Sequence, residues 1–217
     1  MADKICLIIS GGEYSPLPKG LRYDHVIACD KGIIYSEKMN IVPDVIIGDF
    51  DSTDESVVSD YILTHSFDQN RVLKFPSHKD DSDTMLAIKE ALKKGYSHLE
   101  IVCALGGRLD HTLANIQSMA YAAEQGASLC RISGKRDILT VIKDSSLILE
   151  KKEGYSLSVF SLSDRCLNVN IRGSAYDAEG ITLTGTFPLG LSNEYVSDRV
   201  SVSVETGILL IVESSYL

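Results

Sequence analysis

The sequence lacks the features that mark several classes of protein. No run of Lys or Arg occurs in its 217 residues and the formal net charge is −9, which argues against nucleic acid or an anionic membrane surface as the main partner. No segment approaches the roughly 18 apolar residues of a membrane span. The apolar run near the N-terminus is too short for a signal peptide and stops at Gly11-Gly12. We therefore expect no nucleic acid and no membrane among the partners, whereas polyphosphates remain open if metal ions intervene.

Cysteine is sparse and widely spaced. The five cysteines are odd in number and form no Cys-x-x-Cys motif; they are Cys6, Cys29, Cys103, Cys130 and Cys166. All but the last lie in apolar, strand-like runs, where cysteine behaves as a small buried hydrophobe. This usage is typical of a reducing compartment, so we expect a soluble, cytoplasmic protein without a disulfide framework.

Two common phosphate-binding sequences are also missing. No Gly-x-x-x-x-Gly-Lys-Ser/Thr segment occurs, so the chain is not a P-loop protein. No Gly-x-Gly-x-x-Gly follows the first apolar run, where "SGGEYSP" (10–16) is only a weak substitute.

What the sequence does contain is an ordinary globular composition, 44% hydrophobic and 24% charged, on a chain long enough for one large domain or two small ones. Up to about residue 143, apolar runs alternate with helical spacing. The runs 5–10, 25–30, 44–49, 71–75, 99–106 and 127–133 predict strands, and 53–66, 82–94 and 109–125 predict helices. This alternation favours a parallel sheet with helices packed on it.

After residue 143 the hydrophobic period falls to two. The segments 155–162, 167–173 and 199–206 alternate apolar with polar residues, as half-exposed antiparallel strands do. We therefore predict an α/β protein in which a Rossmann-like parallel-sheet domain (1–143) precedes a small all-β sandwich or barrel (144–217).

Charged residues follow four consecutive strands of the predicted parallel sheet. They are Asp30, then Asp49 and Asp51 in "VIIGDFDST", then Lys79, Asp80, Asp81 and Asp83 in "SHKDDSD", then Arg108, Asp110 and His111 in "GGRLDH". Parallel strands end at one edge of a sheet, where ligands bind. We call these residues the acidic rim. Their carboxylates would repel one another unless cations bound them, and with the basic groups they suit magnesium and a polyphosphate.

Each cluster also has a structural interpretation when it is taken alone. Asp30 can cap a helix, and the carboxylates of 80–83 can complement a helix dipole, worth about 0.3–1 kcal/mol per charge. Gly106-Gly107 can be a tight turn, and His111 an ordinary half-buried histidine. These interpretations do not explain why four successive turns carry such residues at one edge.

Four motifs together resemble the thiamine pyrophosphokinase family over essentially the whole chain. They are "GDFDS", "KDDSD" as a variant of Lys-Asp-x-Thr-Asp, "GGRLDHTLANI" and, late in the chain, "GLSNE". The resemblance implies transfer of a pyrophosphoryl group from ATP to the hydroxyl of thiamine, giving thiamine diphosphate and AMP. It also implies a homodimer whose sites lie at the subunit interface and are formed by both domains.

The resemblance further implies roles for individual residues. Magnesium would be held by Asp49, Asp51 and Asp83, with Asp80 as a further ligand, and the first three of these would be catalytic together with Arg108. ATP would be bound by Asp30, Lys79, Asp80, Arg108 and Asp110. Thiamine would be bound by Ser192 and Asn193.

Two departures from the family pattern stand out. Ser82 replaces a threonine but keeps the hydroxyl, and the chain has no tryptophan to stack on the thiazolium ring. Tyr195 is a candidate for that stacking role.

Two other functions remain as alternatives. "DVIIGDFDST" also fits the Asp-x-Asp-x-Ser/Thr signature of haloacid-dehalogenase-type phosphatases, in which the first Asp is a nucleophile. That motif belongs on the first strand of its domain, whereas two predicted strands precede it here. The other alternative is a nucleotide-binding sensor that keeps the acidic rim but has no turnover.

Overall fold

The computed structural model describes residues 4–50, 55–76 and 81–216. These residues form a mixed α/β fold with a large sheet and a second, antiparallel sheet. Two compact units are present: unit 1 is Met1–Ala122 with Ile132–Lys135, and unit 2 is Ala123–Arg131 with Arg136–Leu217. The predicted domain boundary after residue 143 stays a prediction.

Unit 1 alternates strands and helices, as predicted. Its elements are β1 (Ile5–Ile9), β2 (His25–Cys29), α1 (Gly32–Lys38), β3 (Val45–Gly48), α2 (Glu55–Thr64), the 3-10 turn η1 (Gln69–Arg71), β4 (Val72–Lys74), α3 (Asp83–Lys93), β5 (His98–Val102) and α4 (Leu109–Glu124). The strands pair in the order β5-β1-β2-β3-β4, and every one of these pairs is parallel. The predicted parallel sheet is confirmed for these strands.

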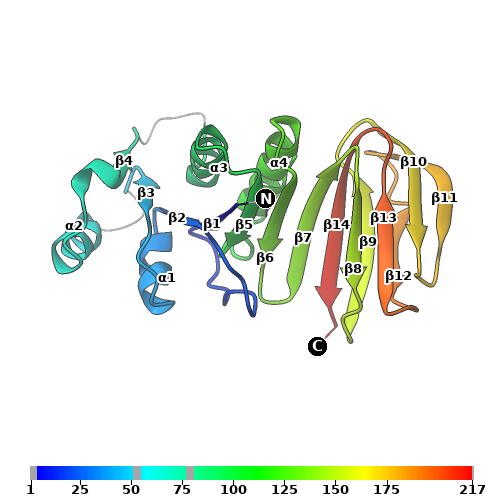
Figure 1. Cartoon of the computed structure of the whole chain (residues 1–217), viewed down its shortest axis with the longest axis horizontal. Coiled ribbons are helices and arrows are strands. Elements are labelled where there is room, and N and C mark those ends of the chain that lie inside the picture. The colour runs from blue at the N-terminus through cyan, green and yellow to red at the C-terminus, as the bar shows by residue number, and fades with distance from the viewer. Residues whose placement is uncertain (1–3, 51–54, 77–80, 217) are drawn as a thin grey trace. The chain divides into compact units, whose positions relative to one another are not determined.

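Helices cover both faces of this sheet (Figure 1). The connections through α1 and α2 lead from β2 to β3 and from β3 to β4, whereas the connection through α3 returns from β4 to β5. Because such crossovers are right-handed, α3 must lie on the face opposite α1. Accordingly, α1 packs against β1 and β2, and α3 against β1, β2 and β3.

Four of these five strands are buried along nearly their whole length, as their apolar runs predicted, whereas the edge strand β4 has no buried residue. In β3 all four residues are buried, and in β1, β2 and β5 all but the first are. Burying a Leu or Ile side chain completely stabilises the fold by about 1.5–3 kcal/mol, so these strands form a rigid base for the residues that follow them.

One helix of unit 1, α1, was not among the predicted elements. It has only seven residues, too few to show a helical repeat in the sequence. Its first residue, Gly32, lies so close to β1 that an added Cβ would come within 2.1 Å of the Ile9 carbonyl oxygen. Glycine is therefore required where α1 begins.

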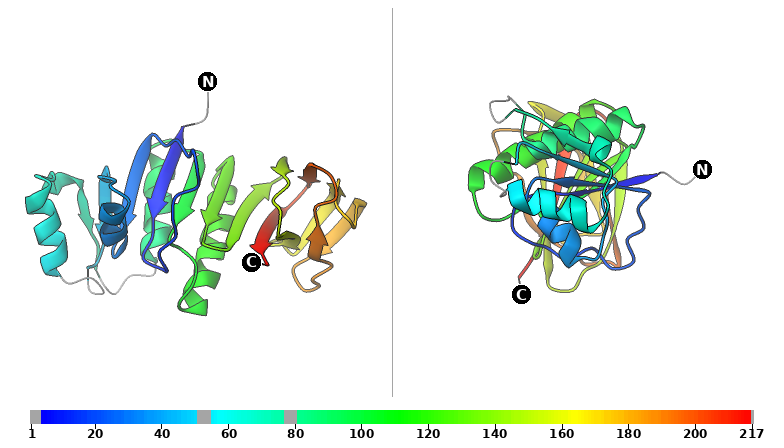
Figure 2. Two further views of the ribbon diagram at one scale, coloured as in Figure 1. Left: turned by 90° about the horizontal axis from the view of Figure 1, so that it is seen from below. Right: turned by 90° about the vertical axis from the view of Figure 1, so that its left-hand side faces the viewer.

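Unit 2 contains β7 (Asp137–Lys143), β8 (Ser146–Glu150), β9 (Tyr155–Ser161), β10 (Arg165–Arg172), β11 (Ala178–Thr184), β12 (Gly190–Glu194), β13 (Arg199–Ser203) and β14 (Ile208–Ser215). These strands run from green-yellow to red in Figure 2. One antiparallel layer has the order β12-β9-β14-β7 and the other β11-β10-β13-β8. The strand β6 (Leu129–Ser133) contributes residues to both units.

The two layers of unit 2 share one hydrophobic core. One layer contributes Ile142, Leu157, Val159, Leu209 and Ile211, and the other contributes Leu149, Cys166, Val169, Ile171, Leu183, Val200 and Val202. Alternate residues of β13 supply this core, as do those of β10 outside its bulge, which agrees with the period of two in the sequence. The prediction that β9 is half-exposed is wrong, because none of its residues is exposed. None of the helices in the described part of the chain is long and apolar enough to cross a membrane.

Candidate active site

Three predicted site residues lie at the carboxyl edge of the parallel sheet in unit 1. Asp30 directly follows β2, and Asp49 directly follows the neighbouring strand β3. The Asp30 amide donates a hydrogen bond of 2.8 Å to the Ile47 carbonyl, so the pairing of these strands continues to the rim. Asp83 begins α3, which packs over β1, β2 and β3. The fold therefore brings these carboxylates to one edge, as predicted.

Backbone strain is concentrated at the same edge. Asp30, Phe50 and Cys103 have left-handed backbones, with φ of 46°, 63° and 58°, and each lies one or two residues beyond a strand. A residue other than glycine in this conformation costs of order 1–3 kcal/mol, and such residues cluster at functional sites. The strain therefore marks the ends of β2, β3 and β5 as a constrained rim.

Phe50 shows how the backbone directly after β3 is held. Its side chain is buried in a cluster with Ile46 and Val58, while the Asp49 side chain is only partly buried. An added Cβ on Gly48 would lie 3.1 Å from the Phe50 ring, so the glycine lets the ring fold back against the strand end. Phe50 thus anchors the backbone beside Asp49. Asp51 itself lies outside the described residues.

The start of α3 shows which residues of "KDDSD" are already engaged. The Ser82 hydroxyl caps the helix by accepting from the Met85 amide at 3.2 Å, so serine and not aspartate is the cap. Asp81 is paired with the ammonium group of Lys89, at 2.8 and 2.7 Å. Asp83 lies in the first helical turn, where the helix dipole favours a negative charge. Lys79 and Asp80 lie outside the described residues.

Arg108 and Asp110 form an exposed bidentate pair at the start of α4. Arg108 donates from Nε at 3.1 Å and from Nη2 at 2.6 Å to the two carboxylate oxygens. This pairing lowers the pKa of Asp110 and raises the pKa of Arg108. Among the described residues, this pairing occupies two of the five guanidinium N–H groups, which leaves three for another anion. The predicted pair is thus present and oriented.

In unit 2, the two residues predicted to bind thiamine have different surroundings. Ser192 is exposed, with a left-handed φ of 58°, and its amide donates to the Ser158 hydroxyl at 3.0 Å. Asn193 is only 6% exposed. Its side-chain oxygen accepts from the amides of Tyr176 and Glu194, and its nitrogen donates to the Ser174 hydroxyl and the Tyr176 carbonyl. The Asn193 side chain thus fastens residues 174–176 to β12.

This arrangement identifies a residue that the sequence did not single out. Tyr176 is held at both its amide and its carbonyl by Asn193, and its side chain is 72% exposed. Nothing in the pattern of the sequence links positions 176 and 193, because the contact depends on the path of the chain between β10 and β12. The structure thus places the backbone of Tyr176, an exposed aromatic residue, beside the "GLSNE" segment.

Tyr195 lies in the core of unit 2. It is 9% exposed and its hydroxyl donates to Glu213 Oε1 at 2.5 Å, while Lys152 Nζ donates to the same oxygen at 2.6 Å. Burial and the neighbouring carboxylate raise the pKa of Tyr195. The suggestion that Tyr195 stacks on thiazolium is therefore corrected, since its ring packs in the core.

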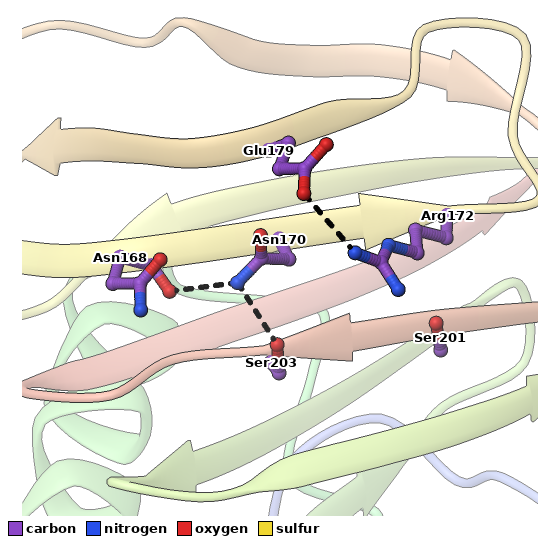
Figure 3. Close-up of a pocket in the computed structure, with 6 residues that line it drawn as sticks. All are labelled: Asn168, Asn170, Arg172, Glu179, Ser201 and Ser203. Atoms are coloured by element: carbon purple, nitrogen blue, oxygen red, sulfur yellow. Dashed lines mark hydrogen bonds and ion pairs between the residues drawn. The ribbon is translucent and has the colours of Figure 1, made fainter.

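A shallow polar groove of about 360 Å³ lies on unit 2, and none of the residues that line it is a predicted site residue (Figure 3). It is lined by Asn168, Asn170, Arg172, Glu179, Ser201 and Ser203. Asn170 donates to the Asn168 carbonyl at 3.0 Å and accepts from the Gly180 amide at 3.0 Å. These bonds lie where the β10–β11 register shifts, so the side chains stabilise β-bulges.

Comparison with known proteins agrees with the motifs. Residues 21–130 match the family model "Thiamin pyrophosphokinase, catalytic domain", and residues 145–209 match "Thiamin pyrophosphokinase, vitamin B1 binding domain". The thiamine pyrophosphokinase of Bacillus subtilis (strain 168) is 26% identical over 220 residues, which cover 96% of this chain and 97% of the relative.

Solved structures give the same result. The crystal structure of thiamine pyrophosphokinase from Bacillus subtilis has a TM-score of 0.85 at 27% identity and covers 99% of this chain and all of its own. The enzyme from Candida albicans has a TM-score of 0.73 at 16% identity, covering 98% of this chain and 90% of its own, and shows a shared fold. With both family models matched across more than half of its length, the chain belongs to the thiamin pyrophosphokinase family.

Proposed function

We infer that this chain transfers the pyrophosphoryl group of ATP to the hydroxyl of thiamine, giving thiamine diphosphate and AMP. The observation that carries this function is the match of both family models, one for catalysis and one for vitamin B1 binding, to successive parts of the chain. The thiamine hydroxyl oxygen bonds to the β-phosphorus, and the bond from that phosphorus to the oxygen bridging it to the α-phosphorus breaks. AMP leaves with that oxygen, and the hydroxyl proton passes to solvent or a carboxylate.

We propose that magnesium is held by Asp49, Asp51 and Asp83, with Asp80 as a further ligand. Carboxylate oxygens suit this ion, which usually takes one or two carboxylates together with substrate phosphates and water. Asp49 and Asp83, the two of the four that the structure describes, fit this requirement because they share the carboxyl edge of one sheet. When bound, magnesium neutralises charge on the phosphate oxygens of ATP.

The proposed ATP site uses Asp30, Lys79, Arg108 and Asp110, with Asp80. Arg108 is the best supported of these, because Asp110 fixes the plane of its guanidinium group and leaves three N–H donors for phosphate oxygens. The catalytic contribution of the chain is then positioning of the two substrates and stabilisation of the charge that develops on AMP.

The proposed thiamine site uses Ser192, Asn193 and Tyr176. Ser192 offers an exposed hydroxyl, and the exposed ring of Tyr176 can stack on the cationic thiazolium or the pyrimidine. Asn193 contributes by holding Tyr176, since its own amide is already engaged.

We further propose a cytoplasmic homodimer with sites at the subunit interface. Exposed apolar side chains adjoin the predicted site residues in both units and suit burial against a second copy; they are Leu109 and Leu113 beside Arg108, and Leu189 and Leu191 beside Ser192. A Rossmann-like first domain (1–143) and an all-β second domain (144–217) complete the proposal. The phosphatase alternative fits less well, because its motif follows β3, with β1 and β2 before it in the chain.

Substitution of the carboxylates tests the metal assignment. Asp51→Asn and Asp83→Asn should each abolish formation of thiamine diphosphate while the far-ultraviolet circular dichroism of the protein is kept. Asp60→Asn, on the exposed surface of α2, is the matched control and should keep full activity. Full activity in either rim variant would contradict the assignment.

A further inference from the structure

A buried pair of hydroxyl groups joins the first turn of α3 to the end of β1. Ser10 directly follows β1 and is 4% exposed, and Thr84 is the second residue of α3 and is 5% exposed. Their oxygens are 2.5 Å apart, and either one can be the donor. The Ser10 amide also donates to the carbonyl of Val102, the last residue of β5, at 2.9 Å. Thr84 is thereby linked to two neighbouring strands at the carboxyl edge.

Packing alone does not require these hydroxyls. Alanine and valine would fill nearly the same volume as serine and threonine without the cost of burying polar groups. What the hydroxyls add is direction, because a hydrogen bond this short fixes the position of Thr84 relative to the strand end. The residue immediately before Thr84 is Asp83, so its position is fixed at the same time.

Two other bonds at the start of α3 stay local to that helix. The Ser82 cap is made to the amide of Met85 in the same helix. Asp81, just before α3, pairs with Lys89 within α3, and both side chains are about a third exposed. This pair therefore connects the helix only with the segment that leads into it. The bond between Ser10 and Thr84 instead joins the first turn of α3 to the end of β1.

We propose that Ser10 and Thr84 are positioning residues that set Asp83 for metal binding. This inference rests on the proposed function, in which Asp83 is a magnesium ligand. Removal of a group that orients a metal ligand typically lowers metal affinity or activity about tenfold to hundredfold. Because both side chains are buried, the Ser10–Thr84 bond acts through the backbone of α3.

Calorimetric titration with α,β-methylene-ATP tests the proposal without turnover, because the bond that pyrophosphoryl transfer breaks is replaced in this analogue. The dissociation constant is measured once with Mn²⁺ and once with EDTA, and the ratio of the two values is the metal coupling of the site. The wild-type chain should show strong coupling. In the double variant Ser10→Ala/Thr84→Val this ratio should be smaller by about tenfold or more, while the dissociation constant measured in EDTA should not change.

The double variant separates positioning from stability. Replacing both partners of a hydrogen bond by apolar groups of the same shape is nearly neutral for folding, so its melting temperature should stay close to that of the wild type. The single variant Thr84→Ser keeps the hydroxyl and should therefore keep the metal coupling of the wild type. Thr140→Val removes another buried threonine hydroxyl, which accepts from Arg131 in unit 2, and should leave the coupling unchanged.

The outcomes distinguish this inference from the proposed function. Wild-type coupling in the double variant, or an equal loss in Thr140→Val, would overturn the positioning role. Asp83→Asn should abolish the coupling. If Asp83→Asn keeps it, the magnesium assignment is wrong and the positioning role is wrong with it. If Asp83→Asn loses the coupling and the double variant keeps it, only the positioning role is wrong.

Discussion

Tyr195 and Tyr176 of unit 2 allow a core residue to be distinguished by experiment from a binding residue. Tyr195 donates to the buried carboxylate of Glu213, whose side chain is 2% exposed and which also pairs with Lys152. Tyr195→Phe removes this hydrogen bond and keeps the ring. A hydrogen bond to a charged group contributes about 1.5–3 kcal/mol, and in a chain of this size each kcal/mol corresponds to roughly 2–4 °C in melting temperature. The expected decrease is therefore roughly 3–12 °C.

Thermal denaturation followed by circular dichroism measures this decrease, with Tyr216→Phe, a 65% exposed position, as the control that should not change. The KM for thiamine should be unaffected in Tyr195→Phe. In Tyr176→Ala it should rise roughly 2- to 30-fold, because a contact between a cation and an aromatic face contributes about 0.5–2 kcal/mol. An unchanged melting temperature in Tyr195→Phe would refute the core assignment. An unchanged KM in Tyr176→Ala would refute the stacking role.

Three further predictions follow from the structure of unit 1. Gly32→Ala should destabilise the protein by about 1–3 kcal/mol in urea unfolding, because its Cβ would meet the Ile9 carbonyl. The control Gly11→Ala should be tolerated, because its Cβ would meet nothing nearer than 3.5 Å. Equal effects of the two substitutions would contradict the close approach of α1 to β1. Burial raises the pKa of Cys6 from its ordinary 9.0 to about 12, so the unfolded chain loses this proton first and stability should fall as pH rises from about 9 towards 12. The fall should flatten in Cys6→Ser, and an unchanged slope would exclude Cys6 as its source. Arg108→Lys should lower kcat/KM for ATP about tenfold to hundredfold, because an ammonium group lacks the planar set of donors with which a guanidinium group pairs with Asp110 and binds phosphate at once. Wild-type kinetics in this variant would exclude Arg108 from the ATP site.

Much of the fold was predictable because its strands obey simple periodicities. The run around Ile46 and Ile47 is apolar throughout because β3 is covered on both faces, and the alternation around Val200 and Val202 reflects a strand with one buried face. The helices α2, α3 and α4 lie within the predicted segments. Among the elements that were not predicted, α1 is shorter than two helical repeats, and β8 and β12 present mainly exposed residues. Local sequence carries little signal for any of these three.

The site was predictable only in part, for a related reason. Asp30, Asp49 and Asp83 could be placed at one edge because the carboxyl ends of parallel strands must meet there. The role of Asn193 could not be predicted, since its partners Ser174 and Tyr176 are 19 and 17 positions away in the sequence. The same holds for Ser10 and Thr84, which are 74 positions apart in the sequence.

Product analysis tests the central claim most directly. The purified chain is incubated with thiamine, Mg²⁺ and ATP labelled at the γ-phosphate, and the nucleotides and thiamine esters are separated by chromatography. Pyrophosphoryl transfer predicts AMP and thiamine diphosphate in equal amounts, with the label in thiamine diphosphate. Formation of ADP with thiamine monophosphate, or hydrolysis of ATP with thiamine unchanged, would contradict the proposed reaction.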